Sequence, residues 1–196
     1  MTALRPDLAR IALEVPERAR VLDVGCGDGA LMAELRDAKG CDARGMEIDA
    51  ELVEQAVARG LSVVQGDADR DLADYPDAAF DVAILSQTLQ TARRPDMLLE
   101  QLLRVGREAF VSFPNFAYWR MRLSLLRHGR MPVTRHLPVS WYETPNIHHL
   151  TVADFRDFLA HNAVDVRGCW FFADGSEIGG GNANWRAEHA VFRLSL

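Results

Sequence analysis

The stretch RVLDVGCGDGALMAEL, residues 20–35, contains the pattern on which the fold prediction rests. From Val21 to Val24 it is apolar apart from Asp23, which predicts a buried strand. Three glycines at alternate positions then form a turn, and the apolar residues after them recur at helical spacing. A strand, a glycine-rich turn and a helix in this order are typical of the first βα unit of an open α/β sheet, beside which such folds bind their ligands.

The same rhythm continues along the chain. Apolar runs predict strands at 21–24, 42–48, 61–65, 80–85 and 108–113, and helical spacing predicts helices at 4–12, 31–38, 52–57 and 97–105. Strands that alternate with helices indicate a parallel sheet with helices on both faces.

The C-terminal part has a different pattern. Thr151 and Asp154 form a T-x-x-D signal that predicts the start of a helix. Two further strands, 164–172 and 185–196, are joined by the glycine-rich stretch 173–184, which is short enough to make them antiparallel. We therefore predict an α/β fold of Rossmann-like type, in which a mostly parallel sheet ends in a C-terminal antiparallel hairpin. Residues 1–196 are expected to form one domain.

Composition narrows the class of protein. The 196 residues are 48% hydrophobic and 26% charged, as in globular proteins, and no apolar run is long enough to span a membrane. The N-terminus lacks the apolar centre of a secretory signal, so we expect a cytoplasmic protein.

The three cysteines, Cys26, Cys41 and Cys169, are not spaced as in a CxxC motif. The sequence therefore favours neither a disulfide framework nor a metal site.

The segment 114–150 matches none of the predicted elements. It is rich in aromatic residues, and residues 115–142 carry five arginines and no acid, within a chain of net charge −6. Long insertions at the carboxyl end of a strand are usually functional. Tyr118, Trp119, Trp141 and Tyr142 line an acceptor pocket in one interpretation and a lid or partner surface in the other. Because the rest of the chain is acidic, the arginines favour a protein partner over nucleic acid.

Charge indicates which ligand the glycine turn holds. A dinucleotide places a pyrophosphate at this helix N-terminus, and the turn formally fits G-x-G-x-x-A through Ala30. Asp23 and Asp28 disfavour such an anion, and we expect no lysine or arginine near enough to offset them. S-adenosylmethionine carries a sulfonium and an ammonium, for which carboxylates are favourable.

Two further acids follow strands at suitable spacing. Glu47 ends the second predicted strand, where it can accept hydrogen bonds from both ribose hydroxyls, and Gly66-Asp67-Ala68 follows the third, where Asp67 can accept from an adenine amino group. Together with the glycine turn, this pattern resembles the class I S-adenosylmethionine-dependent methyltransferases. The other predicted cofactor contacts are Gly25, Cys26, Gly27, Gly29, Ile48, Ser86 and Gln87.

The second half of the chain narrows the resemblance. The segments SFPNFAYWRMRLSLLRHGRMPVTRHLP (112–138) and WYETPNIHHLTVADF (141–155) resemble the methionine biosynthesis protein MetW family. This resemblance implies a methyltransferase-like fold and association with a homoserine O-acyltransferase, MetX, whose activity the protein supports.

No catalytic base stands out from the sequence. The stretch after the fourth strand, Ser86-Gln87-Thr88-Leu89-Gln90, lacks the N/D-P-P-Y/W motif of base-methylating enzymes. His148 and His149 are adjacent, and in a strand they point to opposite faces. We predict a protein that binds S-adenosylmethionine or S-adenosylhomocysteine and supports the acyltransferase; an active small-molecule methyltransferase is the competing hypothesis. The candidate substrate or partner contacts are Asn115, Tyr118, Trp119, Trp141, Tyr142, Asn146 and His148.

Overall fold

A computed structural model describes residues 4–134 and 139–196, so that Arg135, one of the five arginines noted above, lies outside the described residues. One sheet of eight strands runs through the molecule in the order β3-β2-β1-β4-β5-β8-β6-β7. The strands are β1 (Arg20–Val24), β2 (Asp42–Glu47), β3 (Ser62–Gln65), β4 (Phe80–Ser86), β5 (Gly106–Pro114), β6 (Asp165–Ala173), β7 (Ser176–Ile178) and β8 (His189–Ser195). β1 to β5 are parallel, as predicted.

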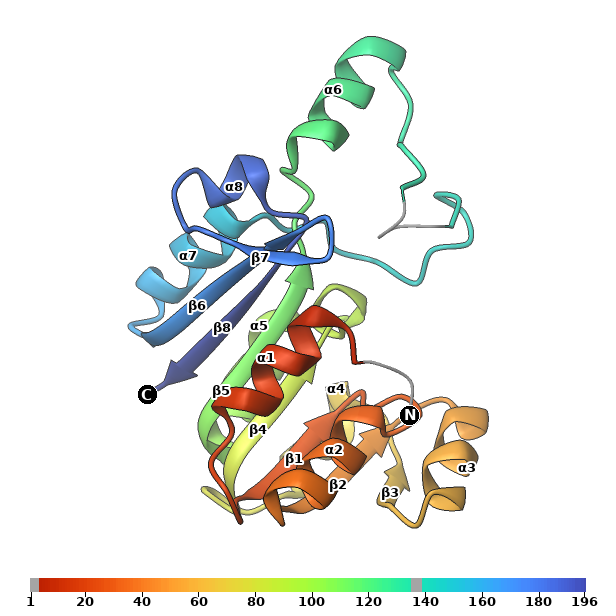
Figure 1. The fold of residues 1–196 in the computed structure, drawn as a ribbon, viewed down its shortest axis with the longest axis vertical. Coiled ribbons are helices and arrows are strands. Elements are labelled where there is room, and N and C mark those ends of the chain that lie inside the picture. Colours follow the sequence, from red (N-terminus) through yellow and green to blue (C-terminus); the bar gives the residue numbers. More distant parts are fainter. Residues whose placement is uncertain (1–3, 135–138) are drawn as a thin grey trace.

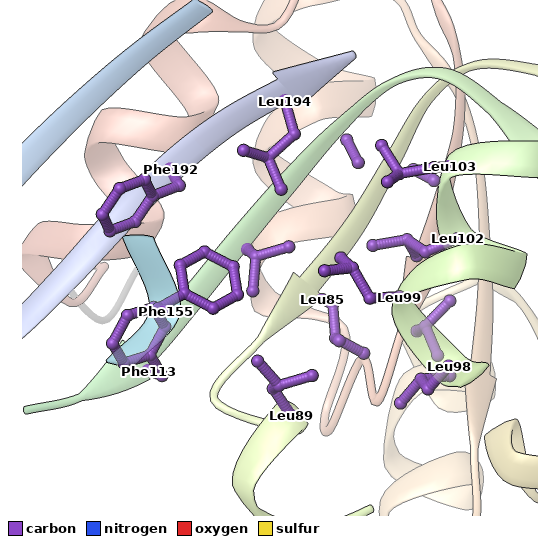
Figure 2. Close-up of a cluster of buried hydrophobic side chains, with 14 of the residues drawn as sticks. Leu85, Leu89, Leu98, Leu99, Leu102, Leu103, Phe113, Phe155, Phe192 and Leu194 are labelled. Carbon is purple, nitrogen blue, oxygen red and sulfur yellow. The ribbon is translucent and has the colours of Figure 1, made fainter. Parts of the chain in front are cut away.

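Helices cover both faces of the sheet (Figure 1). They are α1 (Pro6–Glu14), α2 (Ala30–Lys39), α3 (Ala50–Ala58), α4 (Ala68–Asp71), α5 (Pro95–Val105), α6 (Trp119–His128), α7 (Val152–His161) and α8 (Ala183–Arg186), with short 3-10 turns η1 (Leu72–Asp74) and η2 (Leu89–Thr91). One buried cluster joins α1 and α2 to the sheet through Ile11, Leu31 and Phe110. A second joins α5 and α7 to the opposite face, where the leucines of α5 and Phe155 of α7 pack on the strands (Figure 2), and a small third cluster packs α3 against α2 through Met32 and Ala56. Burial of these apolar side chains is the main force that fixes the elements to the sheet.

The C-terminal strands are antiparallel, as predicted. β8 lies between β5 and β6 and is antiparallel to both. The connection before it is more structured than the sequence suggests, because it contains β7 and α8. The second strand begins at His189 rather than at Trp185, since the amides of Trp185 and Arg186 donate to the carbonyl of Asn182 and form a helical turn.

The T-x-x-D signal is a complete capping box. The hydroxyl of Thr151 accepts a hydrogen bond from the amide of Asp154 at 3.1 Å, and the Asp154 carboxylate accepts from the amide of Thr151 at 3.0 Å. These reciprocal bonds satisfy two amide donors at the start of α7. The predicted helix start is confirmed.

The insertion contains a helix that the sequence analysis did not predict. α6 covers Trp119–His128 and ends at Gly129, which has a φ of 60° and donates its amide to Leu125. Met121 is the only buried residue of this helix, and in Figure 1 the helix stands away from the sheet. The apolar periodicity of a core-facing helix is therefore missing. Among the described residues, no helix is long and apolar enough to span a membrane.

Candidate functional site

A cavity of about 710 Å³ opens at the carboxyl ends of the parallel strands. Parallel α/β sheets place their ligand sites at this edge, and the volume lies within the usual range for small-molecule sites. Of the predicted cofactor contacts, the residues that line it are Gly25, Glu47, Ile48, Asp67, Ala68, Ser86 and Gln87. Asp23, Cys26, Gly27 and Gly29 do not line the cavity.

The glycine turn is held in place by its neighbours. Gly25, Gly27 and Gly29 have φ values of 73°, 57° and 75°, a region that side chains disfavour. A Cβ on Gly25 would lie 2.2 Å from the Thr88 hydroxyl, whereas a Cβ on Gly27 would meet no atom within 4 Å. Gly25 therefore serves close packing of the turn on the loop after β4, and Gly27 serves its backbone shape.

Glu47 connects the end of β2 to the glycine turn. Its Oε2 accepts from the amide of Gly27 at 2.8 Å, and its Oε1 accepts from the amides of Ile48 and Asp49 at 2.9 and 3.1 Å. A carboxylate has about four acceptor positions, so that one, on Oε2, remains. Glu47 can thus accept one hydroxyl without rearrangement, and a second hydroxyl would have to displace an amide.

Asp67 follows β3 and has two roles. Its Oδ1 accepts from the amide of Asp69 at 3.1 Å and so caps α4. Its Oδ2 makes no hydrogen bond within the described parts of the chain, and the residue lines the cavity. One carboxylate oxygen is therefore structural, and the other can accept from a ligand amino group.

Asp23 is buried beneath the site, without a hydrogen-bond partner for its Oδ1 among the described residues. Burial, and then the charge of Glu47, raises the pKa of Asp23 to about 7, although Arg5 opposes this shift. Burial also raises the pKa of the Cys26 thiol far above its usual value. Cys26 is therefore an inert packing residue rather than a nucleophile.

The prediction that no lysine or arginine offsets the charge of Asp28 was wrong. The guanidinium of Arg59, at the end of α3, lies 2.8 Å from Oδ2 of Asp28, and Oδ1 accepts from the amide of Ala30. The pair forms because α2 and α3 lie side by side, which the local sequence does not show. Asp28 thus caps α2 in a neutral pair, which leaves Glu47 as the carboxylate that gives the turn its negative charge.

The loop after β4 forms the floor of the cavity. Gln87 has a φ of 54°, unusual for a residue other than glycine, and its amide donates to the carbonyl of Ser112 at 2.8 Å. Gln90 is buried, and its Nε2 donates to the carbonyl of Gln87 at 2.7 Å. Gln90 therefore supports the strained residue from below.

Part of the insertion covers the cavity. Val139, Thr144, Pro145, Asn146 and Ile147 line it, so Asn146 is placed at the site. The aromatic residues of the insertion do not line the cavity. Trp141 and Tyr142 are 76% and 70% exposed. Trp119 lines a separate groove along α6, and Tyr118 is buried at the start of that helix.

Asn115 and the two histidines also lie apart from the cavity. The Asn115 amide donates to the carbonyls of Asn184 and Ala187, and its oxygen accepts from the amides of Ala117 and Val152, so that it joins the insertion to α7 and α8. His148 and His149 do not lie in a strand. The His149 ring contacts Phe116, and His148 borders a smaller cavity beside α5 and α7.

Arg5 is a cavity residue that the sequence analysis missed. It precedes α1, and its guanidinium bonds to Asp7 and to Ser86. Nothing in the sequence near Arg5 identifies it, because its partner Ser86 lies 81 positions away.

Comparison with known proteins identifies the family. A sequence profile of methionine biosynthesis protein MetW matches residues 5–194. The chain belongs to the MetW family. It is 35% identical over 189 residues to the bifunctional methionine biosynthesis protein MetXA/MetW of Rhodopirellula baltica, covering 90% of this chain and 30% of that protein. The chain thus spans less than a third of that relative's length.

Other relatives are methyltransferases. This MetW-family chain is 34% identical over 174 residues to the ubiquinone biosynthesis O-methyltransferase of Xylella fastidiosa, covering 84% of this chain and 69% of that enzyme. A SAM-dependent methyltransferase from Archaeoglobus fulgidus superposes with a TM-score of 0.72 at 15% identity, over 96% of this chain and 91% of the other. An S-adenosylmethionine-dependent methyltransferase from Mesorhizobium loti superposes with a TM-score of 0.71 at 16% identity, over 96% of this chain and 97% of the other. The predicted class I methyltransferase fold is confirmed.

Proposed function

We propose that this MetW-family protein binds S-adenosylmethionine or S-adenosylhomocysteine in the cavity beside the glycine turn. The observation that carries the proposal is the placement of Glu47 and Asp67. They lie at the carboxyl ends of adjacent strands, line one cavity with Gly25, and each keeps an acceptor position open. An adenosine moiety offers ribose hydroxyls and an adenine amino group as donors, which match these two carboxylates.

The geometry disfavours a dinucleotide. Phosphates bind to free backbone amides at the start of a helix. Here the Gly27 amide already donates to Glu47, and the Ala30 amide donates to Asp28. A pyrophosphate would also meet the carboxylate of Glu47. A ligand whose net charge is not strongly negative fits better.

Titration calorimetry with S-adenosylhomocysteine tests this proposal. Asp67→Asn and Glu47→Gln should each raise the Kd by about tenfold or more, because each removes a charged acceptor. Glu51→Gln, an exposed residue of α3, is the control and should leave the Kd unchanged. Equal affinity in all four proteins would refute the site assignment.

When bound, S-adenosylmethionine supplies a sulfonium with a transferable methyl group. Methyl transfer depends mainly on proximity and orientation, and the described residues that line the cavity include hydrogen-bonding groups but no histidine. The residues of this chain bind and orient such a ligand, and Gln87 and Ser86 lie at the end of the cavity away from Asp67.

We further propose that the protein supports a homoserine O-acyltransferase by binding to it. The family is named for methionine biosynthesis, and the Rhodopirellula relative joins MetXA and MetW in one name. The α6 stripe, which we define as Trp119, Leu123 and Leu126, follows helical i, i+4, i+7 spacing, and both leucines are exposed. A ten-residue helix is marginal alone, so contact with a partner would complete its packing.

Size-exclusion chromatography with the cognate acyltransferase tests the stripe. The double variant Leu123→Asp/Leu126→Asp should lose the complex, whereas Leu13→Asp, at an exposed leucine of α1, should keep it. If both variants still co-elute with the acyltransferase, the partner does not bind the α6 stripe.

One observation favours a second candidate function, methyl transfer to a small molecule. The Xylella relative is an O-methyltransferase, and the cavity extends beneath Val139 and Asn146, beyond the adenosine-side carboxylates. Incubation with methyl-labelled S-adenosylmethionine and a metabolite extract would transfer label to an acceptor if this function is present.

A further inference from the structure

We propose that Arg5 forms a carboxylate subsite at the end of the cavity formed by β4 and β5. It would make the cavity select ligands that keep the α-carboxylate of S-adenosylmethionine over those that lack it. The inference rests on the proposed cofactor function and adds the group that recognises the amino-acid end of the ligand.

The fold fixes the position of Arg5. It is the residue before Pro6, and its φ of −58° and ψ of 149° belong to the extended region that a following proline imposes. α1 begins directly after it and is anchored through Ile11, which is fully buried. Arg5 therefore enters the cavity from a rigid helix start, and not from a loose terminus.

Buried partners hold its guanidinium. The Arg5 Nε and Nη2 donate to Oδ1 and Oδ2 of Asp7, each at 3.2 Å, and Nη2 also donates to the Ser86 hydroxyl at 3.1 Å. Asp7 is 1% exposed and further accepts from the Ser112 hydroxyl at 3.1 Å. Ser86 and Ser112 are neighbours across β4 and β5. A side chain held in this way loses little further entropy when it binds a ligand.

The donors of Arg5 are not exhausted. Guanidinium has five N–H groups, and the bonds to Asp7 and Ser86 use those on Nε and Nη2. Its Nη1 makes no hydrogen bond within residues 4–134 and 139–196, while the side chain is 52% exposed and lines the cavity. Two charged donors are thus available to an anionic group, and carboxylate is a preferred partner of guanidinium.

The rest of the cavity gives the ligand a direction. Glu47 ends β2 and Asp67 follows β3, whereas Ser86, beside Arg5, ends β4 on the other side of β1. Acidic acceptors therefore lie at one end and Arg5 lies at the other; a second arginine, Arg93, lines the cavity on the Asp67 side, where its amide donates to Asp69. A ligand with donors on its adenosine and a carboxylate on its tail fits with its tail at the Arg5 end.

The decisive probe pair is S-adenosylmethionine and its decarboxylated form, which differ only in the carboxylate. Titration calorimetry should show that the wild-type protein binds S-adenosylmethionine at least tenfold more tightly. Arg5→Gln should weaken S-adenosylmethionine by at least tenfold, leave the decarboxylated form within about twofold, and so abolish the preference. Arg5→Lys should keep part of the preference for S-adenosylmethionine. Arg107→Gln, at an exposed arginine of β5 outside the cavity lining, is the matched control and should keep the full preference.

The outcomes separate the claims. If Arg5→Gln weakens both ligands equally or neither, Arg5 only fastens α1 to the sheet, and the subsite is refuted while cofactor binding stands. If the wild-type protein binds neither ligand, the proposed cofactor function fails and the subsite fails with it. Thermal unfolding of each variant, compared with wild type, shows whether a loss of affinity comes from loss of fold. If Arg5→Gln does not fold, Arg5→Lys is the variant that tests the subsite.

Discussion

The carbonyl oxygen of Gln90 accepts a hydrogen bond from the amide of Ile147 at 2.8 Å, and it also accepts one from the amide of His148. Gln90 belongs to the floor of the cavity, and Ile147 belongs to the segment that covers it. Because the Gln90 side chain also holds Gln87, the loop after β4 connects a cavity-lining residue to the cover. A ligand that contacts Gln87 therefore stabilises both the loop after β4 and the segment that covers the cavity.

Ligand binding should protect the cover from hydrogen exchange. We expect S-adenosylhomocysteine to slow exchange of the Ile147 and His148 amides by about tenfold, since opening of the cover would then also release the ligand. Amides in the middle of α7 serve as a control and should change little. Unchanged exchange at the cover, at saturating ligand, would show that it moves independently of the site.

The glycine turn should distinguish two alanine substitutions. Gly25→Ala places a Cβ 2.2 Å from the Thr88 hydroxyl, whereas Gly27→Ala meets no atom within 4 Å and adds only the strain of a positive φ. We expect Gly27→Ala to cost about 1 kcal/mol of unfolding free energy and Gly25→Ala clearly more. Urea denaturation measures the unfolding free energy of both variants and of the wild-type protein. Equal losses would mean that the close contact with Thr88 does not constrain the turn.

Asp23 should make stability depend on pH. Its folded pKa of about 7 lies above its ordinary value of 3.8, so between these pH values the folded state holds one proton more than the unfolded state. Stability therefore decreases as pH rises through this range. Asp23→Asn lacks this contribution, and its stability relative to wild type should rise from pH 4 to pH 8 by on the order of 3 kcal/mol. Denaturation of both proteins across this range measures the difference; a constant difference would contradict a buried, raised Asp23.

Asn115 should matter for stability rather than for ligand binding. Its side chain makes four hydrogen bonds to backbone groups, all of them away from the cavity lining. Asn115→Ala should cost about 2–4 kcal/mol, because buried backbone groups lose their partners. The Kd for S-adenosylhomocysteine, measured below the unfolding transition, should change less than threefold. A large loss of affinity with intact stability would instead support the direct substrate role suggested by the sequence.

The sheet and much of the site could be predicted because their signals are local. The run 20–35 contains strand, turn and helix in consecutive residues, and Thr151 and Asp154 are three positions apart. Glu47 and Asp67 follow directly from strand ends, whose position at one sheet edge is a property of parallel sheets.

Contacts between distant segments could not be predicted in this way. Arg59 meets Asp28 across two helices, and Asp7 meets Ser112 over a separation of 105 positions. Neither pair leaves a periodic pattern. α6 was missed for a related reason: only Met121 of its ten residues is buried, so the core-facing stripe used to recognise a helix is absent.

The most direct test of the proposed function is the rate of acyl transfer by the cognate homoserine O-acyltransferase, measured alone, with this protein, and with this protein and S-adenosylmethionine. We predict that the protein changes the rate, that S-adenosylmethionine alters this effect, and that Asp67→Asn removes the response to the ligand while the effect of the protein remains. An unchanged rate in every mixture, with no complex on size-exclusion chromatography, would contradict the proposed function.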